Sequence, residues 1–135
     1  MIVDRRQPVR IEGLKEARKK IRGLLDELDE QAARGELKNM NQEAAEIVRK
    51  RALGLVPVVT GNLRDTIRAA GAQKSGRVRA GFKRVPYAGP IHFGWASRNI
   101  EPNLFLYDAL DQRRHEVLQH YDQQLDALIK KYGLD

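Results

Sequence analysis

The sequence predicts an α+β domain with two N-terminal helices, a small antiparallel β-sheet and a long C-terminal helix packed on that sheet. Apolar residues recur at helical spacing through residues 11–56 and again through 104–132. Between these stretches, residues 77–83 alternate apolar or small side chains with basic ones, the pattern of a strand with one buried face. At 135 residues the chain is the size of one domain, and we expect that domain to occupy residues 11–135, after a flexible arm at residues 1–10.

The first half of the chain is predicted to form two consecutive helices. The first begins at Ile11 and ends at residues 33–35 (ARG), because glycine often follows the last turn of a helix. The second begins near Asn39 or Asn41, either of which can cap it. It ends before Pro57, since the residue before a proline avoids the helical conformation.

The second half is predicted to contain a β-hairpin followed by the last helix. Two strands, near residues 66–69 and 78–82, flank a polar turn at residues 73–76. Residues 86–103 hold prolines and large aromatic side chains, and we expect an ordered loop or a short helix there. The last helix runs from Leu104 to about Tyr132, with aspartates near its start and lysines near its end, as the helix dipole favours.

The composition excludes several classes of protein. The chain has no cysteine, which excludes disulfide scaffolds, cysteine-ligated zinc and thiol catalysis. No apolar run approaches the roughly 20 residues of a membrane span, and the charged N-terminal residues lack the apolar stretch of a signal peptide. His115 and His120 are spaced so that they do not share a helix face as metal ligands would, and no carboxylate adjoins His92 in the sequence. We therefore expect that the protein is not an enzyme and binds neither a metal ion nor a cofactor. We expect His92 to be buried or to contact a partner.

Charge is distributed unevenly along the chain. The net charge is +7, and residues 61–100 contain eight basic residues and one acidic residue. Residues 101–135 contain seven acidic and four basic residues. A basic surface suits contact with nucleic acid or with an acidic protein, and a basic middle with an acidic end suits head-to-tail self-association. The simplest alternative is a solvated basic face with no partner.

Three short blocks stand out in the second half of the chain. They are residues 57–67 (PVVTGNLRDTI), 87–95 (YAGPIHFGW) and 102–110 (PNLFLYDAL). Together and in this order, they resemble the lambdoid-type tail-completion (neck) proteins of long-tailed phages, a family of small head–tail joining proteins. Residues 11–14 (IEGL) are similar to the start of that family. The residues that carry the resemblance are Pro57, Thr60, Gly61, Leu63, Tyr87, Phe93, Gly94 and Phe105.

The chain departs from the family pattern in the second block. His92 stands where the family often has an acidic residue, and residues 95–99 replace a more usual short polar loop. Both departures concern the surface that this loop presents to a partner.

The resemblance implies a structural role in the virion. Proteins of this family lie between the portal-proximal connector and the tail tube and are expected to form rings, here hexameric, around the path of the DNA. The implied partners are further copies of the chain, neighbouring head–tail connector proteins and the tail-tube or tail-terminator protein. Assembly would take place in the host cytoplasm.

Two sets of residues are candidates for these contacts. Subunit or partner contacts are expected from the loop aromatic residue, its neighbours and the basic strand, namely Trp95, Arg98, Asn99, Arg77, Arg79 and Lys83. Contacts to phosphates of the genomic DNA inside the ring are expected from Arg64, Arg68, Lys74 and Arg84. The alternative function is a basic nucleic-acid-binding protein without sequence specificity, although the chain has no recognisable DNA-reading motif.

Overall fold

The computed structural model describes residues 9–12, 19, 21–23, 30–57, 62–82 and 88–132. Within these residues the predicted α+β class is confirmed, with a three-stranded antiparallel sheet and a long C-terminal helix. The elements follow one another as β1 (Val9–Glu12), α2 (Glu30–Leu55), α3 (Asn62–Asp65), β2 (Arg68–Gly71), β3 (Gly76–Ala80), α4 (Ala88–Phe93), the 3-10 helix η1 (Ala96–Arg98) and α5 (Phe105–Lys131).

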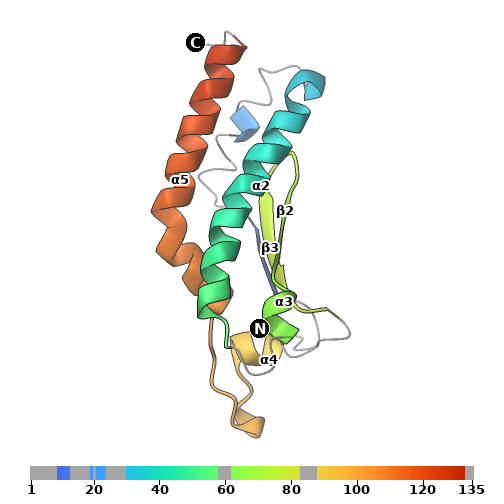
Figure 1. Cartoon of the computed structure of the whole chain (residues 1–135), viewed down its shortest axis with the longest axis vertical. Helices are drawn as coiled ribbons and strands as arrows, with labels where there is room; N and C mark the ends of the chain where they lie inside the picture. Colours follow the sequence, from blue (N-terminus) through green and yellow to red (C-terminus); the bar gives the residue numbers. More distant parts are fainter. Residues whose placement is uncertain are drawn as a thin grey trace.

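The two long helices and the sheet are arranged in layers (Figure 1). α2 lies in the middle, with α5 antiparallel along one side and strands β2 and β3 along the other. β3 is the central strand of the sheet and pairs antiparallel with both β1 and β2. α4 and η1 lie at the end of the molecule where α2 ends and α5 begins.

The apolar core lies between α2 and the two layers that flank it. The largest side chains that are fully buried there are apolar ones from α5 and α2 together with Ile21, and they include Phe105, Leu106 and Leu37. Full burial of one such side chain contributes roughly 1.5–3 kcal/mol. The apolar residues that recur at helical spacing in the sequence therefore form the helix faces that pack together in this core.

Strand β1 corrects two predictions about the N-terminal residues. Val9 and Arg10 belong to a strand instead of the expected flexible arm, and Ile11 and Glu12 extend that strand instead of beginning a helix. Val9 is buried and pairs with Ala80, because the free edge of β3 accepts a third strand. Among the described residues that follow, Lys19 and residues 21–23 are helical.

Helix α2 continues through the predicted break before Gly35. A glycine inside a helix costs about 1 kcal/mol relative to alanine, and burial of the neighbouring Leu37 and Met40 outweighs that cost. Asn41 lies inside α2, where its side chain is buried instead of capping a helix start. Its Nδ2 donates hydrogen bonds to the carbonyl groups of Ala72 and Gln73 in the β2–β3 turn, at 2.7 and 3.2 Å.

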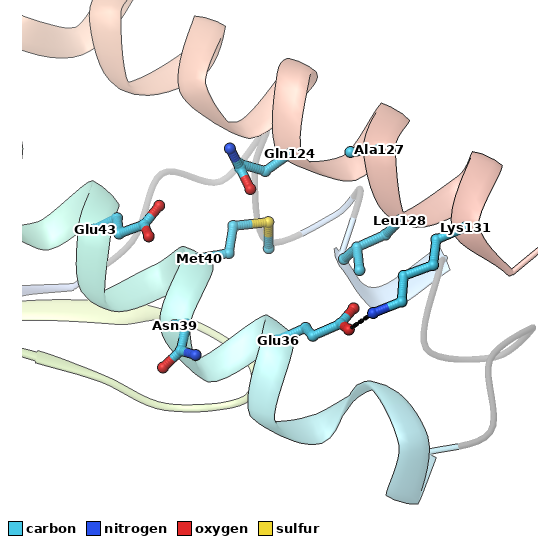
Figure 2. A pocket seen from close by; sticks show the side chains of 8 residues that line it. All are labelled: Glu36, Asn39, Met40, Glu43, Gln124, Ala127, Leu128 and Lys131. Atoms are coloured by element: carbon cyan, nitrogen blue, oxygen red, sulfur yellow. Dashed lines mark hydrogen bonds and ion pairs between the residues drawn. The ribbon is translucent and has the colours of Figure 1, made fainter.

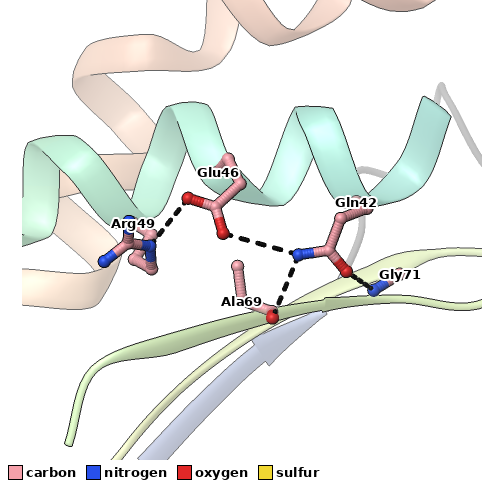
Figure 3. A network of polar contacts seen from close by, with 5 residues as sticks. All are labelled: Gln42, Glu46, Arg49, Ala69 and Gly71. Atoms are coloured by element: carbon pink, nitrogen blue, oxygen red, sulfur yellow. Dashed lines mark hydrogen bonds and ion pairs between the residues drawn. The ribbon is translucent and has the colours of Figure 1, made fainter. Parts of the chain in front are cut away.

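Gln42 joins α2 to the outer edge of the sheet (Figure 3). Its Oε1 accepts a hydrogen bond from the backbone N–H of Gly71 at 2.7 Å, and its Nε2 donates to the carbonyl of Ala69 at 3.2 Å. The side-chain amide thus takes the place that a fourth strand would take beside β2. Nε2 also lies 3.4 Å from Oε1 of Glu46, whose other oxygen accepts a hydrogen bond from Arg49 at 2.7 Å. The edge of the sheet is therefore covered, which prevents it from pairing with another strand.

Gly71 and Gly76 allow α2 and the hairpin to approach each other closely. A Cβ atom on Gly71 would lie 2.4 Å from the carbonyl oxygen of Lys38, and one on Gly76 would lie 2.5 Å from that of Asn41. Both distances are too short for any side chain. The positions of these two glycines also establish that the face of β2 and β3 on which they lie is the face turned toward α2.

Candidate interaction surfaces

The side of the sheet turned away from α2 carries four arginines, Arg10, Arg68, Arg77 and Arg79, which we call the arginine face. Glu12 of β1 lies on the same side, opposite Arg77 in the register. Along β3 the residues alternate between buried Gly76, Val78 and Ala80 and half-buried Arg77 and Arg79. Arg79 pairs with Arg10 of β1 on one side and with Arg68 of β2 on the other. Since neighbouring strands lie about 4.8 Å apart, these three arginines form a row about 10 Å long across the sheet.

The row concentrates positive charge that the described residues do not neutralise. Like charges directly opposite each other on paired strands are destabilising. In the part of the chain that the structure describes, no ion pair joins Arg10, Arg68 or Arg79 to a carboxylate. A surface of this kind favours an anionic partner.

Arg68 is the most strongly held member of the row. Its guanidinium donates hydrogen bonds to the carbonyls of Thr66 and Gly81, at 2.9 and 3.0 Å, and lies over the ring of Phe82 at 4.0 Å from its centroid. Burial, and secondarily the charge of Arg79, lowers the pKa of Arg68 below its ordinary value. Arg68 therefore also supports the start of β2, in addition to contributing charge to the arginine face.

The structure brings together only part of the predicted basic set. Arg68, expected in the set that contacts DNA, shares a face with Arg77 and Arg79, which were expected to contact a protein. Arg64 is exposed in α3 and Lys74 is exposed in the β2–β3 turn, so both lie outside the row. Lys83 and Arg84 lie outside the described residues.

Arg10 is the member of the arginine face that the sequence analysis missed. The alternation of apolar and charged residues from Val9 to Glu12 is a strand signal that could have identified it. Because residues 1–10 were predicted to be a flexible arm, Val9 and Arg10 were not predicted to belong to a strand.

The second surface is the loop from Gly94 to Asn103, which contains η1. The backbone of Trp95 exchanges two hydrogen bonds with Ile100, at 2.8 and 3.1 Å, and these close the loop. Asn99 has a left-handed backbone with φ of 57°, a conformation that asparagine tolerates better than most residues. The guanidinium of Arg98 lies over the indole of Trp95, at 4.7 Å from the ring. The loop thus presents an exposed cation beside a half-exposed aromatic ring, and it extends beyond α4 at the end of the molecule (Figure 1).

Contacts between the second and third sequence blocks hold the base of this loop. Gly94 has φ of 79°, and a Cβ atom there would lie 2.9 Å from Pro102. The backbone N–H of Asn103 donates to the carbonyl of Ile91 at 3.0 Å. The loop therefore leaves and re-enters the domain through a close contact that admits only glycine at position 94.

His92 is buried at the base of the loop, which is one of the two alternatives that the sequence predicted for it. Its ring makes edge-to-face contacts with Phe93, Phe105 and Tyr107, with centroids 4.6, 5.0 and 4.6 Å away. No described residue gives either ring nitrogen a hydrogen bond. Burial lowers the pKa of His92 to about 4, although the charge of Asp108 acts in the opposite direction. The imidazole is therefore neutral near pH 7 and acts as an apolar ring in this cluster.

Of the other residues that carry the resemblance, the structure describes Pro57, Leu63, Phe93 and Phe105. Leu63 and Phe105 are buried, and Pro57 and Phe93 are half-buried. Next to Leu63, the buried Thr66 donates a hydrogen bond from its hydroxyl to the Leu63 carbonyl at 2.6 Å. Thr60, Gly61 and Tyr87 lie outside the described residues.

A groove of about 250 Å³ lies between the first part of α2 and the last part of α5 (Figure 2). An ion pair between Glu36 and Lys131 closes one end of it, and the side chains of Met40 and Leu128 line it. Within the described residues, no three histidines or carboxylates are grouped so that they could hold a metal ion. In the same part of the chain, no helix is both long enough and apolar enough to span a membrane.

Comparison of the chain with protein families, with curated proteins and with solved structures finds no match.

Proposed function

We propose that the protein is a structural ring subunit of a tailed-phage virion, located at the junction between head and tail. In this role it joins the portal-proximal connector to the tail tube, and DNA passes through the ring without being chemically altered. The subunit is assembled in the host cytoplasm together with its connector and tail-tube or tail-terminator partners.

The observation that carries this proposal is the way the second and third sequence blocks meet. Gly94 lies against Pro102, and His92 lies against Phe105 and Tyr107, so the two blocks form one packed base. The loop that contains Trp95 and Arg98 extends from this base. Half-exposed tryptophan and arginine on a well-defined loop are the residue types that most often anchor protein interfaces. The same end also exposes Leu104 and Tyr107, by 37% and 44%.

The test is the native mass of the protein, alone and mixed with its candidate tail-tube and connector partners. We expect a discrete ring, and we expect Trp95→Ala to weaken assembly or partner binding by about tenfold or more while the monomer stays folded. Lys50→Ala, an exposed position on α2, serves as the control. A protein that stays monomeric under all these conditions contradicts the proposal.

The second candidate function is nucleic-acid binding without sequence specificity, and the arginine row favours it. A protein whose row contacts about three phosphates would lose affinity for duplex DNA with a log–log salt slope of about −3. Absence of measurable binding at low salt would exclude this function.

A further inference from the structure

The solvent side of α5 carries a line of four aspartates, Asp108, Asp111, Asp122 and Asp126, which we call the aspartate stripe. All four are exposed. Their separations of three, eleven and four residues correspond to about one, three and one helical turns, so the four lie on one face of the helix. The buried residues of α5, such as Val117 and Leu125, lie on the other side. At about 1.5 Å per residue the stripe is about 27 Å long.

The aspartate stripe and the arginine face lie on two different outer surfaces of the molecule, one on α5 and one on the sheet. α2 packs against α5 on one side and against β2 and β3 on the other (Figure 1), and α5 also contacts β1. Both α5 and β3 bury their apolar residues in the core. The arginine face is turned away from α2, and the stripe lies on the solvent side of α5. The basic middle and the acidic end of the chain thus form two separate surfaces of opposite charge.

We propose that the arginine face of one copy binds the aspartate stripe of a second copy. This inference rests on the proposed ring function, of which it identifies the subunit contact. A contact between two different, complementary surfaces is a head-to-tail contact, and such contacts close into a ring when each step adds a fixed rotation.

Charge complementarity favours a second copy over a nucleic acid as the occupant. A nucleic acid would account for the arginine face but would leave the aspartate stripe without a role. A second copy accounts for both. The arginine row is about 10 Å long, and adjacent aspartates on α5 are about 5–6 Å apart, so one turn of the stripe can meet two arginines of the row. Patches of complementary charge determine which partner binds and how the two copies are aligned in the contact.

The test reverses the charge of each face separately. One variant carries Arg10→Glu and Arg79→Glu, and the other carries Asp111→Arg and Asp126→Arg. Arg68 is kept because it also holds the start of β2. Each variant alone is expected to raise the concentration needed for assembly by about tenfold or more, since like charges then face each other. An equimolar mixture is expected to regain assembly with the two variants in a one-to-one ratio, because every contact in an alternating ring pairs opposite charges.

Matched control variants reverse two charges away from both faces. Lys38→Glu with Lys50→Glu and Glu43→Arg with Glu116→Arg change the net charge equally at exposed positions. We expect both controls to assemble like the unaltered chain, as measured by native mass spectrometry over a concentration series. Circular dichroism of each variant verifies that the monomer is folded.

The outcomes separate this contact from the proposed function. If the ring forms and neither face reversal changes its mass or its midpoint concentration, the contact is wrong and the ring function stands. If the unaltered chain never assembles, alone or with its partners, both are wrong. If the Arg10→Glu, Arg79→Glu variant assembles normally but no longer binds a labelled duplex DNA, the arginine face binds nucleic acid and the proposed contact is overturned.

Discussion

Tyr121 on α5 donates a hydrogen bond from its hydroxyl to Oδ1 of Asn41 on α2, at 2.6 Å. The Nδ2 of the same asparagine donates to the carbonyls of Ala72 and Gln73 in the β2–β3 turn. A single buried side-chain amide therefore connects all three layers of the domain. Because Asn41 and Tyr121 are both buried, neither group can replace its partner with bulk water.

Tyr121→Phe should lower the free energy of unfolding by about 1–2 kcal/mol, because Oδ1 of Asn41 would lose its partner in a buried site. Urea denaturation at neutral pH measures the effect. In an Asn41→Ala background the same substitution should cost much less, since the two residues act as one network. Tyr107→Phe is the matched control, because Tyr107 is 44% exposed, and it should change stability by less than about 0.5 kcal/mol. Equal losses in both backgrounds would contradict the network.

The buried His92 should make the protein less stable in mild acid. Its pKa is lowered from its ordinary 6.5 to about 4 by burial. Between these pH values the unfolded chain binds a proton that the folded chain does not, so the free energy of unfolding falls as the pH drops through this window. Above pH 6.5 His92 is neutral in both the folded and the unfolded chain, so the free energy of unfolding is not reduced there; the loss is complete near pH 4. Urea titrations at several pH values measure the fall.

His92→Phe keeps a ring in the cluster and should reduce this pH dependence, while His115→Gln, at an exposed position, should leave it unchanged. A His92→Phe variant whose stability falls as steeply as that of the unaltered chain would show that another group titrates.

Gly71 and Gly35 should respond in opposite ways to alanine. Gly71→Ala places a Cβ atom 2.4 Å from the Lys38 carbonyl oxygen and 2.5 Å from the Gln42 nitrogen, so we expect a loss of about 2–3 kcal/mol. Gly35→Ala meets nothing within 4 Å on an exposed helical position and should stabilise the protein by about 0.5–1 kcal/mol. Thermal unfolding of the two variants measures the difference, and a stabilising Gly71→Ala would mean that α2 and β2 are not closely packed.

Gln42→Glu should loosen the outer edge of the sheet. A carboxylate can still accept a hydrogen bond from Gly71, but it cannot donate to the Ala69 carbonyl, which it would repel. We expect a loss of about 1–2 kcal/mol, together with faster hydrogen exchange at backbone amides of β2. Arg49→Gln, which removes only the half-exposed end of the same network, should leave exchange in β2 unaltered.

Much of the fold followed from local patterns. The apolar stripe of α5 predicted a helix from Leu104 to about Tyr132, and the helix runs from Phe105 to Lys131. Alternation in β3 placed Arg77 and Arg79 on one face. The prolines and aromatic residues of the second block predicted an ordered loop, and residues 88–103 contain α4 and η1. These features depend on residues only a few positions apart.

The sequence by itself thus determined the α+β class, the last helix and the exposed side of β3, because periodicity and turn chemistry act over short distances. Only the tertiary structure decided that Val9–Glu12 pairs with β3 as a third strand, that α2 continues through Gly35, and that Arg10, Arg79 and Arg68 stand in one row. The physical reason is that each of these depends on a partner far away in the chain. A strand needs a free edge, a weak helical position needs packing to hold it, and the register between paired strands decides which side chains become neighbours.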